Sequence, residues 1–304
     1  MATSSTSNWT GLEARLSGLL RFPADAQLLP RLRDIAAQVA DTARGHRDEL
    51  VYLIVRHDHG RHHNYGVVQS LHTAALCGLL ARRLEWEPDK AASLMGAALT
   101  MNLSILELQG ALASRGEAPS EEERQRIDRH PIDSARLLRE AGLDDEDWLQ
   151  TVEQHHEVAG GGGYPGRMEA PTEMSQLLRF VDMFTAKHSP RTGRTPVPAQ
   201  QAARDLYLQG KRDPLVSLLI KELGIYPPGC YVRLANGEIG IVTHVGDAAH
   251  TPVVASFTTP EGNVLANPPR RDTALPAYAI KATVPDSSIR VTLSVDKLYG
   301  RRTT

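Results

Sequence analysis

The sequence predicts a mainly α-helical protein with a small antiparallel β domain at its C-terminus. Through most of residues 11–225, apolar residues recur at the three- and four-residue spacing of helices. After the Tyr-Pro-Pro-Gly of residues 226–229 they alternate instead with a period of two, which is typical of strands. We therefore expect three parts, an N-terminal helical segment (1–64), a helical bundle (65–225) and a β-rich domain (226–304).

Helical spacing is clearest in six stretches of the predicted bundle. These are residues 66–84, 90–113, 132–142, 145–157, 174–188 and 213–223. Gly, Pro and acidic residues, which commonly cap helices, separate them. Pro119-Ser120 before three glutamates indicates one such helix start. The stretch 57–64 contains four histidines, but their spacing keeps no fixed helical face, so we predict a polar loop there rather than a metal site.

The β-rich domain begins with a strong hairpin signal. Residues 230–234 and 238–242 alternate in polarity around Asn236-Gly237, a pair that favours the tight turn of a two-stranded hairpin. Further strands are expected at 252–258, 276–281 and 289–295. Together these segments predict a small antiparallel sheet or barrel.

Charge and composition limit the kinds of partner. The 34 basic and 36 acidic residues give a net charge of −2, so no broad basic face for a nucleic-acid polymer is expected. Cys77 and Cys230 lie far apart without metal-ligand spacing, which is typical of a reducing cytoplasm. The start of the chain lacks the pattern of a signal peptide, and no stretch has the apolar length of a membrane span. The sequence thus predicts a cytoplasmic protein that does not bind membranes.

Residues 155–166 carry the strongest indication of chemistry. His155 and His156 end a predicted helix and are followed by Glu157 and a run of four glycines. Imidazoles are common transition-metal ligands, and glycine lets the backbone approach a ligand closely. Taken alone, the pattern fits either a ligand-binding loop or a flexible loop after two surface histidines.

The same stretch resembles the signature of the HD-GYP family, which comprises bacterial cyclic di-GMP phosphodiesterases of the HD superfamily. In that signature, His-His-Glu is followed at this distance by Gly-Tyr-Pro, here Gly163, Tyr164 and Pro165. The β-rich tail also resembles a short C-terminal extension of some members. The resemblance implies a helical bundle of the HD superfamily.

Other elements of the family occur in the same order within residues 65–225. His72 matches an upstream histidine, and His130 precedes a proline and opens the predicted helix 132–142. Asp182 matches a late aspartate, followed by Arg191 and Arg194. The resemblance implies a metal site and a ligand site with the following residues. The metal ligands would be His130, His155 and His156 with His72 and Asp182, and the ligand-binding residues would be Gly163, Tyr164, Pro165, Arg191 and Arg194.

The chain departs from the family where the family has an adjacent His-Asp pair, because Met101 and Asn102 stand there. Ser104 and Ile105 replace the following Gly-Lys, and Gly160 replaces an aspartate. In two-metal sites the cations lie about 3.5–4 Å apart. Their repulsion at an effective dielectric of about 20 is on the order of 16 kcal/mol, and a bridging carboxylate offsets part of it. An amide has no net charge and a thioether is a weak ligand for Fe, Mn or Mg, so we do not expect a complete dinuclear or trinuclear centre.

The remaining histidines leave two metal states open, one divalent transition metal (Fe, Mn or Zn) or none. Three functions also stay open. The first is a catalytically silent member that binds cyclic di-GMP, a related nucleotide or a signalling protein partner. The second is a metal-dependent phosphodiesterase with a mononuclear site for cyclic di-GMP or a related phosphate ester, and the third is a scaffold that acts through its β-rich tail. We favour the first, assign no catalytic residue, and add as a hypothesis that two copies form a homodimer.

Overall fold

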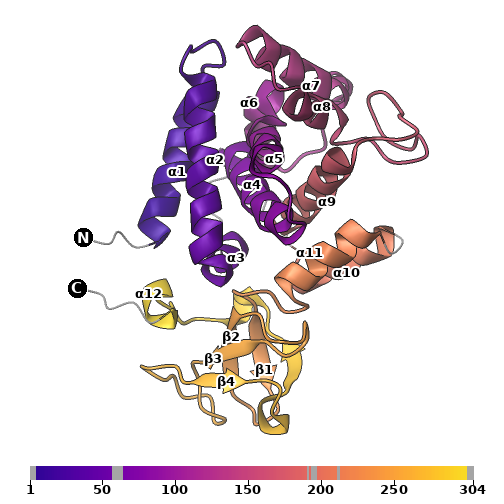
Figure 1. The fold of residues 1–304 in the computed structure, drawn as a ribbon. Coiled ribbons are helices and arrows are strands. Elements are labelled where there is room, and N and C mark those ends of the chain that lie inside the picture. The colour runs from indigo at the N-terminus through magenta and orange to yellow at the C-terminus, as the bar shows by residue number, and fades with distance from the viewer. Residues whose placement is uncertain (1–4, 57–63, 190–191, 193–196, 211–212, 300–304) are drawn as a thin grey trace. The chain divides into compact units, whose positions relative to one another are not determined.

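The computed structural model describes residues 5–56, 64–189, 192, 197–210 and 213–299. Contacts divide the chain into two compact units (Figure 1). The helical unit comprises residues 7–45 and 58–197, and the β unit comprises residues 1–6, 46–57 and 198–304. The fold class expected from the sequence, mainly α with a small antiparallel sheet, is confirmed. The three-part division at residues 64/65 and 225/226 stays a prediction.

The helical unit is built from α-helices and one short 3-10 helix. They are α1 (Ser5–Leu20), α2 (Leu28–Gly45), α4 (Tyr65–Arg83), α5 (Pro88–Thr100), η2 (Leu103–Ile105), α6 (Leu106–Arg115), α7 (Glu121–Glu140), α8 (Glu146–Gln154) and α9 (Glu173–His188). Helix α4 lies at the centre, since its residues from Tyr65 to Ala81 are buried apart from Gly78, and it packs on α2, α5, α6 and α9. Such a helix is apolar on nearly every side because no side faces solvent.

The helix expected at 90–113 is broken into α5, η2 and α6 at Met101 and Asn102. The backbone N–H of Ser104 donates to the hydroxyl of Ser134 on α7 at 3.1 Å instead of continuing the α5 ladder. The interruption is therefore stabilised by a contact between helices, which periodicity does not reveal. The turn formed there holds Met101 and Asn102 in a buried position.

The helix expected at 132–142 begins much earlier, at Glu121. Ser120 accepts the N–H of Glu123, and the Glu123 carboxylate accepts the N–H of Ser120, which is a reciprocal capping box. Pro131 lies inside α7 rather than at its start. His130 therefore sits in the middle of a 20-residue helix, where its backbone position is fixed from both sides.

The stretch Pro88–Arg115 is the one helical run among the described residues with the length and composition to cross a bilayer. However, 72% of its most apolar window is buried inside the protein. This burial is what a core helix shows, and it agrees with the packing of α5 against α4 and α8.

The β unit contains an antiparallel sheet with the strand order β4-β3-β2-β1-β5. The strands are β1 (Tyr231–Leu234), β2 (Ile239–His244), β3 (Val253–Ser256), β4 (Arg270–Asp272) and β5 (Ile280–Thr283). The β1–β2 hairpin has its turn at Asn236-Gly237, as the sequence predicts, and Gly237 has the positive φ of +92° that this position favours.

Three features of the β unit differ from the sequence expectation. The segment 289–295 forms no strand; its alternating apolar residues Ile289, Val291 and Leu293 pack against a core cluster without a strand partner. The expected strand 276–281 begins as a 3-10 turn (Pro276–Tyr278) because proline cannot donate a ladder hydrogen bond. Strand β4, a short edge strand of charged residues, was not expected.

The β unit also contains three helices, α3 (Arg47–Val55), α10 (Ala199–Gln209) and α11 (Pro214–Leu223), and a short helix α12 (Val295–Leu298). Helix α10 was not expected from the sequence. Helix α3 contributes Tyr52 to one of the two apolar clusters on the faces of the sheet, together with Tyr231 and Phe257. A segment from the N-terminal half of the chain thus supplies part of the core of the β unit.

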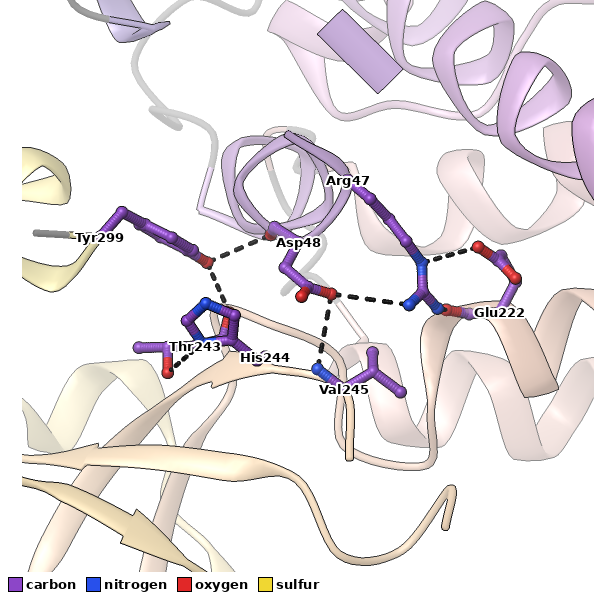
Figure 2. Close-up of polar contacts among 7 residues, drawn as sticks. All are labelled: Arg47, Asp48, Glu222, Thr243, His244, Val245 and Tyr299. Carbon is purple, nitrogen blue, oxygen red and sulfur yellow. Dashed lines mark hydrogen bonds and ion pairs between the residues drawn. The ribbon is translucent and has the colours of Figure 1, made fainter. Parts of the chain in front are cut away.

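Polar contacts hold α3 at the end of β2 (Figure 2). The Tyr299 hydroxyl lies 3.1 Å from the carbonyl oxygen of Asp48 and 2.8 Å from that of Thr243, so it bridges α3 and β2. The Asp48 carboxylate accepts the N–H of Val245 at 3.4 Å. Arg47 forms an ion pair with Glu222 of α11, with 2.6 Å between Nε and Oε1.

Replacing Tyr299 with phenylalanine should therefore destabilise the β unit by about 1–2 kcal/mol, since the carbonyl oxygens of Asp48 and Thr243 lose the one hydroxyl proton that they share. Hydrogen exchange should report faster opening of α3 and β2 amides. Tyr207→Phe is the control, because Tyr207 is 42% exposed in the same unit. Equal exchange in both variants would show that the Tyr299 bridge contributes nothing.

Candidate functional site: a group of three histidines

The structure brings together three histidines from two elements of the helical unit. His130 projects from α7, while His155 is the C-cap residue of α8 and His156 follows it. One ligand nitrogen from each lies within 4.8 Å of the others. His130 and His155 are buried, and His156 is half-buried. This is the three-histidine set expected from the sequence.

The hydrogen bonds of two rings fix where their lone pairs point. Nδ1 of His130 lies 2.5 Å from the carbonyl oxygen of Ile127, and Nδ1 of His155 lies 2.7 Å from that of Val152. A carbonyl oxygen only accepts, so we assign the proton of each neutral ring to Nδ1 and the lone pair to Nε2. The two Nε2 atoms face each other at 3.1 Å.

Two facing lone pairs repel, and a cation between them would remove that repulsion. Donor nitrogens at about 2.0–2.1 Å from a tetrahedral ion lie roughly 3.3 Å apart. The observed separation of 3.1 Å is close to this value. The imidazole set therefore fits one transition-metal ion, with His156 as a third donor beside His130 and His155.

Burial keeps the three rings neutral. It lowers the pKa of His130 to about 4, and together with the neighbouring His130 it lowers the pKa of His155 to about 3. The pKa of His156 is lowered well below its ordinary value, mainly by burial and then by His155, His130 and Arg179. Neutral imidazole is the form that binds metals, so no proton has to be removed at neutral pH.

The Gly-Tyr-Pro loop closes over this group. The Tyr164 ring stacks on the His156 ring with centroids 4.6 Å apart and planes inclined by 25°. A side chain at Gly163 would place its Cβ within 2.5 Å of the His156 carbonyl oxygen and of the Glu157 Cα. Only glycine permits this close approach of the loop to the end of α8. Burial, and then the charges of Asp182 and Asp128, raise the pKa of the Tyr164 phenol.

Comparison with known proteins identifies the helical body. A family model described as HD domain matches residues 28–216. The chain belongs to the HD domain family.

Two relatives agree with this assignment. The chain is 29% identical over 270 residues to a cyclic di-GMP phosphodiesterase of Pseudomonas aeruginosa, a match that covers 83% of this chain but only 65% of that protein's length. An HDGYP protein of Bdellovibrio bacteriovorus has a similar structure, with a TM-score of 0.58 and 16% identity over 69% of this chain and 68% of that one. At this identity the structural likeness shows the fold alone. The resemblance to HD-GYP proteins is thereby confirmed for family and fold.

Two further expected metal ligands of the HD domain lie outside the three-histidine group. The Asp182 carboxylate on α9 accepts a hydrogen bond of 2.6 Å from the Gln69 amide on α4. The His72 ring on α4 stacks on the Trp9 ring of α1 with centroids 6.0 Å apart. Both side chains are buried, and their metal-binding roles stay predictions.

Met101 and Asn102 are buried in the turn after α5. This turn is tied to the histidine-bearing helix, since the Ser104 hydroxyl donates to the His130 carbonyl oxygen at 3.2 Å. A second contact anchors the preceding residue, because the Trp148 indole on α8 donates to the Thr100 hydroxyl at 2.8 Å. The turn is thus held between the two elements that carry the histidines.

Arg191 and Arg194 lie outside the described residues. The structure adds Arg179, which was not among the expected site residues; its positive charge contributes to the lowered pKa of His156. Its place three residues before Asp182 on α9 is a signal that the sequence contains, because such residues lie on one face of a helix. Glu157, part of the His-His-Glu motif, was not among the expected site residues either.

The lowered histidine pKa values predict acid-sensitive stability of the metal-free protein. Below about pH 6.5 the unfolded chain binds protons that the folded histidines, with pKa values of about 4 and about 3, do not bind. The free energy of unfolding should therefore fall as the pH drops from 6.5 toward 4, by about 1.4 kcal/mol per pH unit for each buried histidine.

Urea denaturation in the presence of a chelator at several pH values measures this slope. His155→Gln should reduce the slope, whereas His250→Gln, at an exposed position of the β unit, should not. A slope unchanged in His155→Gln would contradict the assignment of a buried neutral imidazole.

Proposed function

We propose that this chain is a module of bacterial cyclic di-GMP signalling that binds the nucleotide, or a protein partner in its place, without hydrolysing it. The observation that carries the proposal is the pair Met101-Asn102, buried where the family resemblance places a His-Asp pair. The cytoplasmic location and the pairing of two copies, both expected from the sequence, remain part of the proposal.

The lack of a carboxylate at Asn102 argues against a second metal ion. Two cations at about 4 Å repel by roughly 16 kcal/mol at an effective dielectric of about 20, and a neutral amide cannot offset this. Asp182 could supply a negative charge, but its carboxylate accepts a hydrogen bond from Gln69 at 2.6 Å and lies outside the histidine group. The arrangement therefore supports a single ion.

His130, His155 and His156 would hold that ion, and their neutral nitrogens suit Zn or Fe better than Mn, which prefers oxygen ligands. When bound, a divalent ion of this kind supplies Lewis acidity toward a phosphoryl oxygen. The rest of the site orients a ligand, since Arg179 offers a positive charge near His156. The predicted partners Arg191 and Arg194 would add phosphate contacts of the charge-assisted kind.

The loop residues Gly163, Tyr164 and Pro165 would form the other side of the ligand site. A half-buried aromatic ring next to close-packed backbone suits a flat purine base, because bases stack on aromatic side chains. The proposed ligand is therefore a guanine dinucleotide, the substrate named for the Pseudomonas relative.

One observation favours a second function, a working phosphodiesterase with a mononuclear site. The facing Nε2 atoms of His130 and His155 lie 3.1 Å apart, close to the separation of two donors to one ion, and three-histidine sites with an open position occur in catalytic zinc enzymes. In that case the protein would hydrolyse cyclic di-GMP or a related phosphate ester with one bound ion.

Assays of the purified protein separate the two functions. We expect calorimetry to detect cyclic di-GMP binding, and chromatography of the incubated nucleotide to detect no linear product. Product formation that depends on an added divalent metal would instead establish the mononuclear phosphodiesterase. Absence of both nucleotide binding and a copurifying protein would exclude the proposed function.

Restoring the His-Asp pair tests why the protein is proposed not to hydrolyse the nucleotide. Met101→His combined with Asn102→Asp should raise the metal content per chain, measured by elemental analysis, because the carboxylate can then bridge a second ion. Met101→Leu is the matched control, since it keeps an apolar side chain of similar volume without a donor. Unchanged metal content in the double variant would contradict the alignment of this turn with the family's His-Asp pair.

A further inference from the structure

A buried carboxylate lies between the histidines and the glycine run. Glu157 is 1% exposed, and its two oxygens accept the backbone N–H groups of Gly166 at 2.5 Å and Met168 at 2.9 Å. Arg167, between them, has a positive φ of +55°. A residue in this conformation turns neighbouring N–H groups toward one side, which forms a small anion-binding concavity. The carboxylate of Glu157 fills that concavity.

The backbone of Glu157 is itself held in place. Its N–H donates to the carbonyl oxygen of Gln154 at 2.8 Å, and its carbonyl oxygen accepts the side-chain amide of Gln176 on α9 at 3.1 Å. Glu157 is therefore anchored to both α8 and α9. The backbone N–H groups of Gly166 and Met168, which its carboxylate binds, are therefore fixed relative to the end of α8, where His155 and His156 lie.

The base of the loop is closed without Glu157. The N–H of Gly160 donates to the carbonyl oxygen of Glu169 at 2.9 Å, and that of Gly161 donates to the carbonyl oxygen of Met168 at 3.1 Å. The carboxylate of Glu157 adds the contact to Gly166, close to the tip that carries Tyr164. Its loss should therefore free the tip and leave the base in place.

The tip lies against the histidines. The N–H of Tyr164 donates to the carbonyl oxygen of His156 at 3.3 Å, and the Tyr164 ring covers one face of the His156 ring at 4.6 Å. Gly163 lies so close to residues 156–158 that a Cβ there would meet their backbone at 2.4–2.5 Å. Small movements of the tip would therefore uncover His156.

We propose that Glu157 is a positioning residue that holds the Gly-Tyr-Pro tip closed, so that Tyr164 shields the three-histidine group and slows the release of a bound ion. This deepens the proposed function and rests on it, because it takes the three histidines as the metal-binding group. The residue touches neither the ion nor the nucleotide; it acts through Tyr164.

Glu157→Gln tests the positioning role, since it keeps the shape but turns one acceptor into a donor that faces a backbone N–H. Glu153→Gln is the matched control, the same change on α8 at a residue whose carboxylate pairs with Arg139 at the surface. Hydrogen exchange at Gly166 and Met168 should accelerate by roughly tenfold in Glu157→Gln, the effect of losing one charge-assisted hydrogen bond. It should be unchanged in Glu153→Gln.

The second readout is the release of Zn²⁺ from the loaded protein into excess chelator. Glu157→Gln and Tyr164→Ala should each speed release severalfold. If Glu157 acts through Tyr164, the double variant should release Zn²⁺ no faster than Tyr164→Ala alone. Additive effects, or an unchanged rate in Glu157→Gln, would overturn the proposal.

A third readout does not depend on metal. The stacked Tyr164 ring should change the chemical shifts of the His156 ring protons in nuclear magnetic resonance spectra. Glu157→Gln should reduce this change, whereas Glu153→Gln should not affect it. If the wild-type protein binds no Zn²⁺ but the shift responds in this way, the metal assignment fails and the positioning role stands. If the shift does not respond, the positioning role fails. Glu157→Asp, which keeps the charge, replaces the Gln variant if that variant does not fold.

Discussion

The facing lone pairs of His130 and His155 determine what the site can do. Each ring is held by a backbone carbonyl oxygen three residues earlier in the chain, so neither ring can turn away without losing that bond. Burial also makes protonation of either ring costly. A cation is thus the partner that suits these two nitrogens at their separation of 3.1 Å.

The rest of the helical unit serves to keep that arrangement. Helix α7 places His130 in its interior, while His155 and His156 lie at the end of α8, which packs against α7. The turn at Met101 and Asn102 is tied to the same two helices. The residues that flank Met101 and Asn102 are thus bonded to both elements that carry the histidines.

The sequence predicted the histidine group because His155 and His156 lie in one short motif and because His130 precedes them in the order of the family resemblance. It did not predict features that depend on contacts between elements, such as the break in the helix at Asn102, which a hydroxyl on α7 stabilises. Alternation at 289–295 resembles a strand, yet those residues fill a core without pairing. Arg179 was missed because its spacing from Asp182 indicates only a shared helix face, whereas its proximity to His156 depends on the packing of α9 against α8.

Anomalous X-ray diffraction from crystals grown with a transition metal tests the central claim most directly. We predict a single anomalous peak bounded by the Nε2 atoms of His130 and His155 and a nitrogen of His156. Two or three peaks, with an ion beside Asn102 or Asp182, would contradict the account, because a neutral amide would then be sufficient to hold neighbouring cations together.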